Sequence, residues 1–353
     1  MTDILDNAQI IRQKDPSGAL NVIASQFEQA IFDAKVWNDT HDNREITSLV
    51  VSGMGGSALA ALMLKAVLQS KLAISFDIIR GYDLPAYVNE KTLVIASSYS
   101  GNTEETLSAL EQAEHKGAQV GILASGGKLI DIASNYDIAH VTLPAGIQPR
   151  MAVLYNLRGL AALLQTFGVI EPGLLEEIAD LSEWLGQESR LWAPEIPTNE
   201  NYAKQLALDA VGKTPVFYGG ATTASLAYKW KISWNENAKN VAFWNEYPEF
   251  NHNEFLGWVS HPVEKPFEIF DIKSSFERPR ILQRFELSDR LLSGKRPHAQ
   301  AIELKGNSLL AQLLWGSILA DYASAYTAIL NGVDPTPVVL IEKLKQELAD
   351  DPR

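Results

Sequence analysis

The stretch TSLVVSGMGGSALAALMLKAVLQ, residues 47–69, decides the fold. It begins with a short apolar run, which predicts a buried strand. A turn with three glycines follows, and the apolar run from Ser57 to Gln69 then predicts a buried helix. A strand, a glycine-rich turn and a buried helix in this order are typical of a parallel, doubly wound α/β sheet.

The same alternation continues through the first half of the chain. Further strands are predicted over 76–80, 92–100 and 118–125, and further helices over about 104–116 and 151–167. Asn102 and Glu105 have the spacing of a capping box at the start of the first of these helices, and Gly117 can end it. In such a sheet the ligand-binding loops lie at the carboxyl ends of the strands.

A second α/β unit is predicted after the proline-bearing segment PEIPT. Its predicted strands cover 214–220, 267–273 and 299–305, and its predicted helices cover 221–239, 309–330 and 338–348. The likeness between VVSGMGGSALAALMLK and VFYGGATTASLAYKWK predicts a duplication of one α/β unit. We therefore expect two doubly wound, flavodoxin-like parallel-sheet domains, over 1–165 and 199–353, joined by a helical connection and linker over 166–198.

Composition narrows the class of protein. The 353 residues include no cysteine, which excludes disulfides, cysteine-ligated zinc and a thiolate nucleophile. The net charge of -13 argues against a nucleic-acid partner, because binding to phosphate backbones needs a basic surface. The first residues, MTDILDNAQIIRQKD, lack the pattern of a signal peptide, and polar residues interrupt the longest apolar stretches. We expect a cytoplasmic protein without a membrane partner.

Two loops at the expected sheet edge have the chemistry of a phosphate site. Ser98, Ser100 and Thr103 surround the start of a predicted helix, where hydroxyls, free backbone N–H groups and the helix dipole attract an anion. A second loop with Gly55, Gly56 and Ser57 ends at the same edge. Two such loops together favour a bound phosphate over a helix start that contacts only water.

A nucleotide site is the principal alternative. The run from Gly53 to Ala58 satisfies the loose dinucleotide pattern G-x-G-x-x-G/A, and Arg80 could hold a 2′-phosphate. A nucleotide site would leave the Ser100 loop and the whole second half of the chain without a role. A Walker loop is excluded because no Gly-Lys-Ser/Thr follows at the required spacing.

A dense group of polar residues lies in the second half. NENAK, residues 235–239, contains Glu236, and PEFNHNE, residues 248–254, contains His252. His252 and Glu254 form an H-x-E pattern, but no cysteine exists to complete a zinc deaminase site.

Taken together, these motifs resemble a known family. SGMGGS, SSYSGNTEET, the Pro149-Arg150 pair, NENAK and PEFNHNE, in this order, are similar to the motifs of the bifunctional phosphoglucose/phosphomannose isomerases. That family belongs to the phosphoglucose isomerase superfamily and is built from two SIS (sugar isomerase) domains. The resemblance covers nearly the whole chain. It implies interconversion of glucose 6-phosphate or mannose 6-phosphate with fructose 6-phosphate through a cis-enediolate, with no cofactor and no metal.

The resemblance also implies roles for individual residues. Glu236 would move the proton between C1 and C2, Arg150 would stabilise the enediolate, and His252 would assist ring opening from the partner subunit of a homodimer. The residues implied to bind the sugar 6-phosphate are Gly55, Gly56, Ser57, Ser98, Ser100, Thr103 and, near the sugar, Ser324. Ser324 would be the small hydroxyl residue that leaves room for mannose.

One position departs from the family pattern. Asn331 stands where an unaided alignment places a lysine that assists ring opening, so either a neighbouring base replaces it or ring opening is slower. Two other functions stay open on the sequence alone: a sugar-phosphate sensor that binds without isomerising, and a nicotinamide-dependent oxidoreductase built on the first glycine loop.

Overall fold

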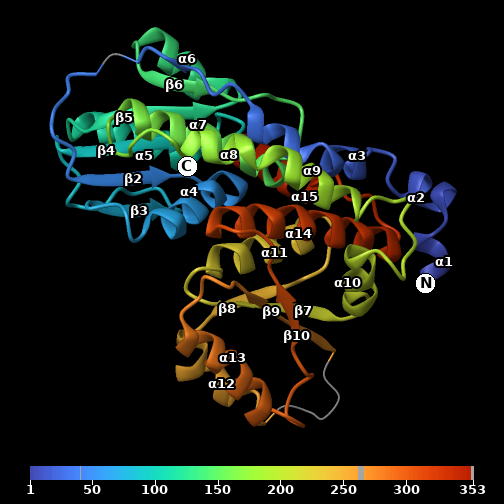
Figure 1. Cartoon of the computed structure of the whole chain (residues 1–353). Helices are drawn as coiled ribbons and strands as arrows, with labels where there is room; N and C mark the ends of the chain where they lie inside the picture. The colour runs from blue at the N-terminus through green and yellow to red at the C-terminus, as the bar shows by residue number, and fades with distance from the viewer. Residues whose placement is uncertain (40, 261–265, 351–353) are drawn as a thin grey trace.

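The computed structural model describes residues 1–39, 41–260 and 266–350, and it contains two sheets with helices between them (Figure 1). The first sheet has the strand order β1-β6-β5-β4-β2-β3, with β1 antiparallel and the other pairs parallel. Its strands are β1 (Val36–Trp37), β2 (Ser48–Ser52), β3 (Ser75–Ile79), β4 (Thr92–Ser97), β5 (Gln119–Ala124) and β6 (Ala139–Thr142). Its helices are α4 (Gly55–Leu68), α5 (Glu104–His115), α6 (Gly127–Asn135) and α7 (Val153–Thr166).

The second sheet has the order β8-β7-β9-β10, and all its pairs are parallel. Its strands are β7 (Thr214–Gly219), β8 (Phe243–Glu246), β9 (Phe267–Lys273) and β10 (Gln300–Glu303). The helical segments of this half are α10 (Tyr202–Ala210), α11 (Ala224–Glu236), η3 (Glu249–His252), α12 (Glu254–Gly257), α13 (Pro279–Leu291), α14 (Leu309–Asn331) and α15 (Val339–Asp350).

The two sheets share one topology. When the parallel strands of each sheet are numbered in chain order, the first sheet reads 2-1-3-4-5 and the second reads 2-1-3-4. The first is the flavodoxin-like order, and the second is the same order with one strand fewer. The predicted fold class is confirmed, and the shared order supports the predicted duplication.

Short helices at the N-terminus and in the connection cover one side of the molecule (Figure 1). They are α1 (Thr2–Leu5), α2 (Ala8–Lys14), α3 (Ala19–Ala24), η1 (Gln26–Ile31), α8 (Leu174–Asp180) and α9 (Ser182–Arg190). The turn η2 (Pro149–Met151) connects β6 to α7. Because α1 and α3 pack against α14, the start of the chain is fixed to a helix of the second half.

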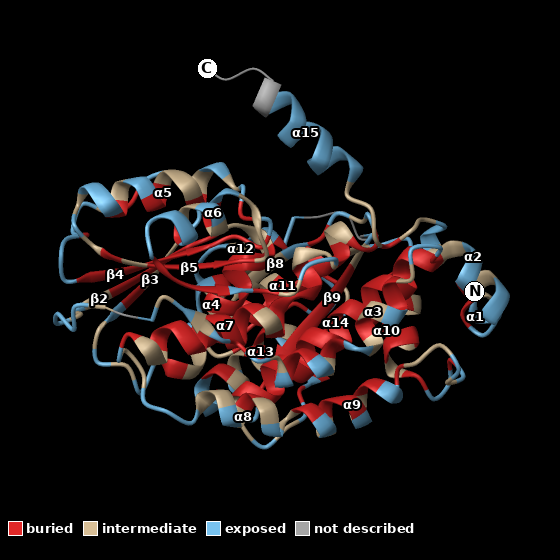
Figure 2. Ribbon diagram, turned by 90° about the horizontal axis from the view of Figure 1, so that it is seen from above, coloured by how far each residue is buried: buried red, intermediate tan, exposed pale blue. Residues whose placement is uncertain are grey.

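Helix α14 lies between the two sheets (Figure 1), and nearly all of it is buried (Figure 2), which explains its apolar composition. It packs against α10 and α11 of its own half and against α4 of the first half. It is long and apolar enough to span a membrane, yet 94% of its most apolar stretch is buried inside the protein. One hydrophobic cluster includes side chains of α4, α7, α11 and α14, so the core is continuous from one sheet to the other.

Helix α15 projects from the body of the protein (Figure 2). The sequence predicts its position correctly, but the helix leaves an apolar stripe in solvent. Leu340 is 82% exposed, and Val339, Leu344 and Leu348 are also exposed. A stripe of large apolar side chains is unusual on the surface of a monomer.

Two details of the helix ends differ from the prediction. Helix α5 begins at Glu104 with Thr103 as its N-cap, and Asn102 instead accepts a hydrogen bond from the backbone of Lys128, so the predicted capping box is wrong. Helix α11 ends at Glu236 rather than at residue 239, because Lys239 has a φ of 51°. A left-handed residue cannot continue an α-helix. Gly117, with a φ of 66°, ends α5 as predicted.

The turn before α11 binds a carboxylate of its own chain. The Thr222 backbone N–H and hydroxyl both donate to Glu277 Oε2, at 2.9 and 2.7 Å. Gly220 makes this possible, since a Cβ there would lie 2.2 Å from the same oxygen. In the second half, therefore, an internal anion lies at the helix start that corresponds to α4 of the first half.

Candidate active site

Arg150 lies in η2, where the chain leaves the first sheet and contacts α11 of the second half. Its side chain is fully buried. The guanidinium donates to Asn237 Oδ1 at 2.5 Å, to Gln148 Oε1 at 3.2 Å, and to the carbonyls of Pro335 and Thr336 at 2.9 and 3.0 Å. Burial lowers the pKa of Arg150, and the carboxylates of Glu236 and Asp321 oppose that shift. An arginine remains charged despite such a shift, so the structure holds a fixed cation here.

Glu236 is the anion that meets this cation. It is the last residue of α11, and its Oε2 lies 3.1 Å from Arg150 Nη1. The carboxylate is 25% exposed whereas the guanidinium is not exposed at all. The pair therefore presents one accessible carboxylate beside a buried positive charge. Such an arrangement can take up a proton and stabilise an oxyanion next to it.

Asn237 and Ser324 extend this pair into the core. Asn237 Nδ2 donates to Ser324 Oγ at 2.8 Å, and Ser324 in turn donates to the carbonyl of Ala320 at 2.7 Å. Both side chains are fully buried. Ser324 thus lies two hydrogen bonds from Arg150, and its predicted contact with the sugar stays a prediction.

The glycine loop fixes the Arg150 turn by close backbone contact. A Cβ on Gly56 would lie 2.6 Å from the carbonyl oxygen of Pro149 and 2.9 Å from the nitrogen of Arg150. Only glycine allows the start of α4 to approach η2 so closely. Gly55, with a φ of 49°, begins α4 in a conformation that favours glycine.

The hydroxyl-rich loop after β4 is tied to the same region. Ser57 Oγ accepts from the backbone N–H of Tyr99 at 2.9 Å, and the Tyr99 hydroxyl donates to the carbonyl of Pro144 at 2.8 Å. Pro144 belongs to the segment that leads into η2. The two loops therefore lie together at one edge of the sheet, and both are connected to the segment that carries Arg150.

The predicted phosphate contacts differ in how accessible they are. Ser98 Oγ and Thr103 Oγ1 lie 2.7 Å apart at the start of α5, with Ser98 buried and Thr103 half-buried. Ser100 is exposed, and its Oγ accepts a long hydrogen bond of 3.4 Å from the Asn102 backbone. Gly101 lets this loop pack on the next one, because a Cβ there would overlap the carbonyl of Gly126.

His252 is not brought to this site within one chain. It ends η3, which precedes α12 at the outer end of the second half, away from the first sheet (Figure 1). The residue is exposed. Its predicted role in ring opening, as a residue contributed by a partner subunit, stays a prediction.

Lys239 is a residue of the site that the sequence analysis quotes without a role. Its Nζ donates to the carbonyl of Glu236 at 2.7 Å and to that of Pro335 at 2.8 Å. Burial of the ammonium, together with the charge of Arg150, lowers the pKa of Lys239 to about 8. Asn331, by contrast, is exposed and donates to the carbonyl of Ala238 at 3.1 Å. Lys239 is therefore an amine beside Glu236, and whether it replaces the lysine expected at position 331 stays a prediction.

A cavity of about 650 Å³ opens beside Glu236. Its walls come from the end of α11 and from the segment that leads into α15. The lining residues are Asn235, Glu236, Lys239, Asn240, Val241, Val333, Asp334, Pro337, Val338, Val339, Leu340 and Ile341. One wall is thus the first turn of α15, from Val339 to Ile341, and the shape of this cavity depends on where that helix lies.

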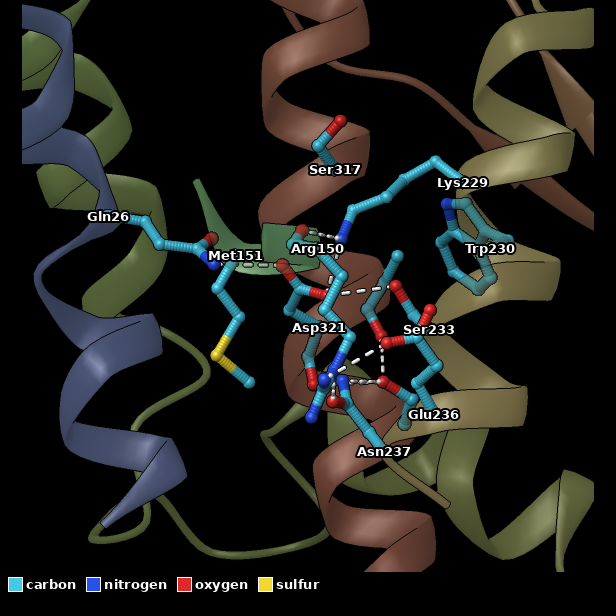
Figure 3. Close-up of polar contacts among 12 residues, drawn as sticks. Gln26, Arg150, Met151, Lys229, Trp230, Ser233, Glu236, Asn237, Ser317 and Asp321 are labelled. Carbon is cyan, nitrogen blue, oxygen red and sulfur yellow. Dashed lines mark hydrogen bonds and ion pairs between the residues drawn. The ribbon is translucent and has the colours of Figure 1, made fainter. Parts of the chain in front are cut away.

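A buried polar network lies behind Arg150 (Figure 3). Lys229 of α11 donates to the Arg150 carbonyl at 2.8 Å and to Asp321 of α14 at 2.6 Å. Ser233 and Gln26 also donate to the Asp321 carboxylate, at 2.9 and 2.8 Å. Sequence reasoning missed this network, since a lysine between apolar residues of a predicted helix gives no sign of being buried. Within the described residues no group of three or more His, Cys, Asp or Glu side chains could hold a metal ion.

Comparison with known proteins places this site in a family. Residues 44–157 match the SIS domain, and residues 199–348 match the bacterial phospho-glucose isomerase C-terminal SIS domain. A bifunctional phosphoglucose/phosphomannose isomerase of Caldicellulosiruptor bescii is 39% identical over 87% of this chain and 91% of its own length. The chain belongs to the bifunctional phosphoglucose/phosphomannose isomerase family. This confirms the family and the enzyme class, an isomerase, that the sequence motifs predict.

A second relative belongs to the same isomerase family, and a solved structure has the same fold. The bifunctional phosphoglucose/phosphomannose isomerase of Thermoplasma volcanium is 35% identical over 85% of this chain and 91% of its own length. A solved structure of a hypothetical protein from Thermus thermophilus superposes with a TM-score of 0.71 at 15% identity, covering 98% of this chain and 94% of that chain. At that identity the structural likeness supports the fold alone. The predicted domain boundaries stay predictions.

Proposed function

We propose that this isomerase interconverts glucose 6-phosphate and mannose 6-phosphate with fructose 6-phosphate. The relatives named above carry both activities in their names. The observation that carries the proposal is the contact of 3.1 Å between Glu236 and Arg150, which unites an accessible carboxylate with a buried cation. An aldose–ketose isomerisation needs these two groups and no redox cofactor.

The chemical step moves one proton between neighbouring carbons. In the open-chain aldose, Glu236 takes the proton from C2, and the electron pair forms a double bond between C1 and C2 while the carbonyl oxygen gains negative charge. Arg150 stabilises that charge in the enediolate. Glu236 then returns the proton to C1, while the hydroxyl proton of O2 passes to O1 and the carbonyl forms at C2. Loss of the stereochemistry at C2 in the enediolate explains how glucose and mannose phosphates lead to the same ketose.

Substrate binding is assigned to the hydroxyl-rich loops. The 6-phosphate would accept hydrogen bonds from Ser57, Ser98, Ser100 and Thr103 and from backbone N–H groups at the start of α5. Such binding anchors the end of the sugar that does not react, so that C1 and C2 can lie beside Glu236. Gly55, where a Cβ would meet nothing within 4 Å, would let the backbone approach the sugar, whereas the space beside Gly56 is filled by η2.

Incubation with fructose 6-phosphate and separate detection of glucose and mannose 6-phosphates tests this function. Glu236→Gln keeps the size of the side chain but removes the base, and kcat should fall by about 10²- to 10⁴-fold. Glu114→Gln, an exposed glutamate on α5, is the matched control and should retain full activity. Unchanged turnover in Glu236→Gln would disprove the assigned mechanism. Ligand binding without isomerisation by the native protein would favour a sensor.

We further propose that two copies form a homodimer with shared sites. His252 is exposed and the apolar stripe of α15 has no cover within the described residues, which supports a second copy as the partner. His252→Ala and Glu236→Gln should each be inactive alone. Unfolding and refolding them together should recover about a quarter of the native activity, since half the dimers are hybrids with one intact site each. No recovery in a dimeric mixture would place both residues in one chain.

The remaining assignments follow from this chemistry. The reaction would connect the sugar-phosphate pools of glycolysis and gluconeogenesis, which supports a cytoplasmic location without a nucleic-acid or membrane partner. Cell fractionation with an antibody to the native protein tests that location.

A further inference from the structure

The strongest feature outside the assigned site is the buried network around Lys229 and Asp321 (Figure 3). The side chains of both residues are at most 1% exposed. Three parts of the chain meet here: η1 contributes Gln26, α11 contributes Lys229, and α14 contributes Asp321. A buried ion pair costs much of its Coulomb energy in desolvation and is weak evidence for a role in stability alone.

Two buried side chains, Lys229 of the network and the nearby Gln29 of η1, hold the main chain of the catalytic turn at two successive carbonyls. Lys229 Nζ donates to the carbonyl of Arg150 at 2.8 Å, and Gln29 Nε2 donates to that of Met151 at 2.8 Å. Neither bond touches the guanidinium of Arg150. Both fix the backbone from which that side chain extends, while Gly56 closes on the other side of the turn.

The same pair also sets the register between α11 and α14. Asp321 accepts from Lys229 and from Ser233, which lies one helical turn further along α11, at 2.6 and 2.9 Å. Glu236 follows Ser233 by three residues and so lies on the same face of this helix. One carboxylate therefore orients both the turn that bears Arg150 and the helix that ends at Glu236.

We propose that Lys229 and Asp321 are positioning residues for the isomerisation, because they fix the Arg150 turn against the end of α11. They act through Arg150 and Glu236 and do not touch the substrate. This inference rests on the proposed function, in which the relative placement of these two groups determines how well the enediolate is stabilised.

The decisive variants are Lys229→Met and the double variant Lys229→Met/Asp321→Leu. The single variant leaves a buried carboxylate without its cation and should lower both Tm and kcat. The double variant removes both charges and should recover stability, since apolar pairs replace buried ion pairs well. Its kcat should stay about 10- to 100-fold below native, because nothing then holds the Arg150 carbonyl.

A matched control is provided by Lys204, which, among the described residues, is the other lysine whose side chain is fully buried in an ion pair. Its Nζ donates to the carbonyls of Pro194 and Ile196, both at 2.8 Å, and meets Asp6 at 3.2 Å. Lys204→Met removes equivalent bonds away from Arg150. It should lower Tm and leave kcat unchanged at a temperature where the protein is folded.

Binding measurements separate positioning from general damage. Affinity for a sugar-acid phosphate whose carboxylate imitates the enediolate should fall together with kcat in the double variant, while KM for fructose 6-phosphate changes less than about 3-fold. Recovery of kcat together with Tm in the double variant would overturn the proposal. If Lys229→Met does not fold, Gln26→Met removes one bond to Asp321 and should show a smaller loss of the same kind.

Amide hydrogen exchange tests the inference without relying on activity. The amides of Met151 and Ala152 close the η2 turn onto the carbonyls of Gln148 and Pro149. They should exchange faster in the double variant than in the native protein and be unaffected in Lys204→Met. Unchanged exchange in the double variant would contradict the positioning role. If the double variant exchanges faster as expected but the native protein does not isomerise sugar phosphates, only the proposed function is refuted.

Discussion

The carboxylate of Glu236 lies 3.1 Å from the guanidinium of Arg150, although the two residues belong to different halves of the chain. Arg150 follows the last strand of the first sheet, and Glu236 ends the helix after the first strand of the second. The pair therefore exists only when both halves pack on α14. This dependence makes the domain contact part of the catalytic geometry.

Arg150→Lys should show how strictly that geometry requires a guanidinium. A lysine has one nitrogen and cannot reach Asn237, Glu236 and the Pro335 carbonyl together. We expect kcat for fructose 6-phosphate to fall by about 10²- to 10³-fold. Steady-state kinetics and a thermal unfolding curve measure the two effects.

Arg158→Lys is the control for the cost of losing a buried guanidinium. Arg158 donates to the carbonyls of Phe32, Ala30 and Leu175, away from Glu236. The Arg158→Lys variant should lose about 1–3 kcal/mol of stability and keep the native kcat. Equal loss of kcat in both variants would show that general destabilisation, and not the missing guanidinium, is responsible.

Thr103→Val tests the phosphate loop with a side chain of the same shape. The hydroxyl that contacts Ser98 disappears, and with it one expected donor to the phosphate. KM for fructose 6-phosphate should rise about 10-fold while kcat changes little, and inorganic phosphate should compete less well. Thr106→Val on the same helix is the control, because the Thr106 hydroxyl is buried without a partner among the described residues. A similar rise of KM in both variants contradicts the assignment.

Gly56→Ala should disturb Arg150 without touching it. The new methyl group would lie 2.6 Å from the Pro149 carbonyl, so either α4 or η2 must move. We expect a loss of about 1–3 kcal/mol in stability and a fall in kcat that exceeds the change in KM. Gly81→Ala, whose methyl group would meet nothing within 4 Å, should be neutral in both measurements. Native kcat in Gly56→Ala would mean that the turn tolerates the displacement.

Asp271 should make stability depend on pH. Burial raises the pKa of this carboxyl from 3.8 to about 7, and Arg296 and Lys273 oppose the shift only in part. Between these two values the unfolded chain loses a proton that the folded protein keeps, so the free energy of unfolding falls as pH rises from about 4 to 7. The loss reaches at most about 4 kcal/mol. Denaturant unfolding curves at several pH values should show this fall in the free energy of unfolding for the native protein but not for Asp271→Asn. If the free energy of unfolding depends on pH in the same way in both proteins, Asp271 is not the cause.

The sequence was sufficient for most of the strands and helices, but it missed the buried strand β6 and the helix α13. The boundaries predicted for 267–273 match those of β9, and the long apolar stretch after residue 309 is α14. Such elements are predictable because buried elements are rich in apolar residues, although β9 also buries Glu268 and Asp271. The strand β8 escaped prediction since it is four residues long and none of them is buried.

The candidate site was predictable only where motifs are local. The Ser98 loop could be picked out from its hydroxyl-rich sequence, whereas the roles of Arg150 and Glu236 came from the family resemblance of short motifs and stay predictions. Lys229 and Asp321 are separated by 92 residues, and nothing in either neighbourhood marks them as partners. Contacts of this kind depend on the packing of α11 against α14, which no pattern within one helix encodes.

The carboxylate of Glu277 at the start of α11 gives the two duplicated halves different capacities. In the second half the Thr222 amide and hydroxyl are saturated by the protein itself. A gene duplication alone would yield two anion receptors per polypeptide. We expect this chain to retain one, because Glu277 occupies the other from within the protein, and so to bind a single sugar phosphate for each copy.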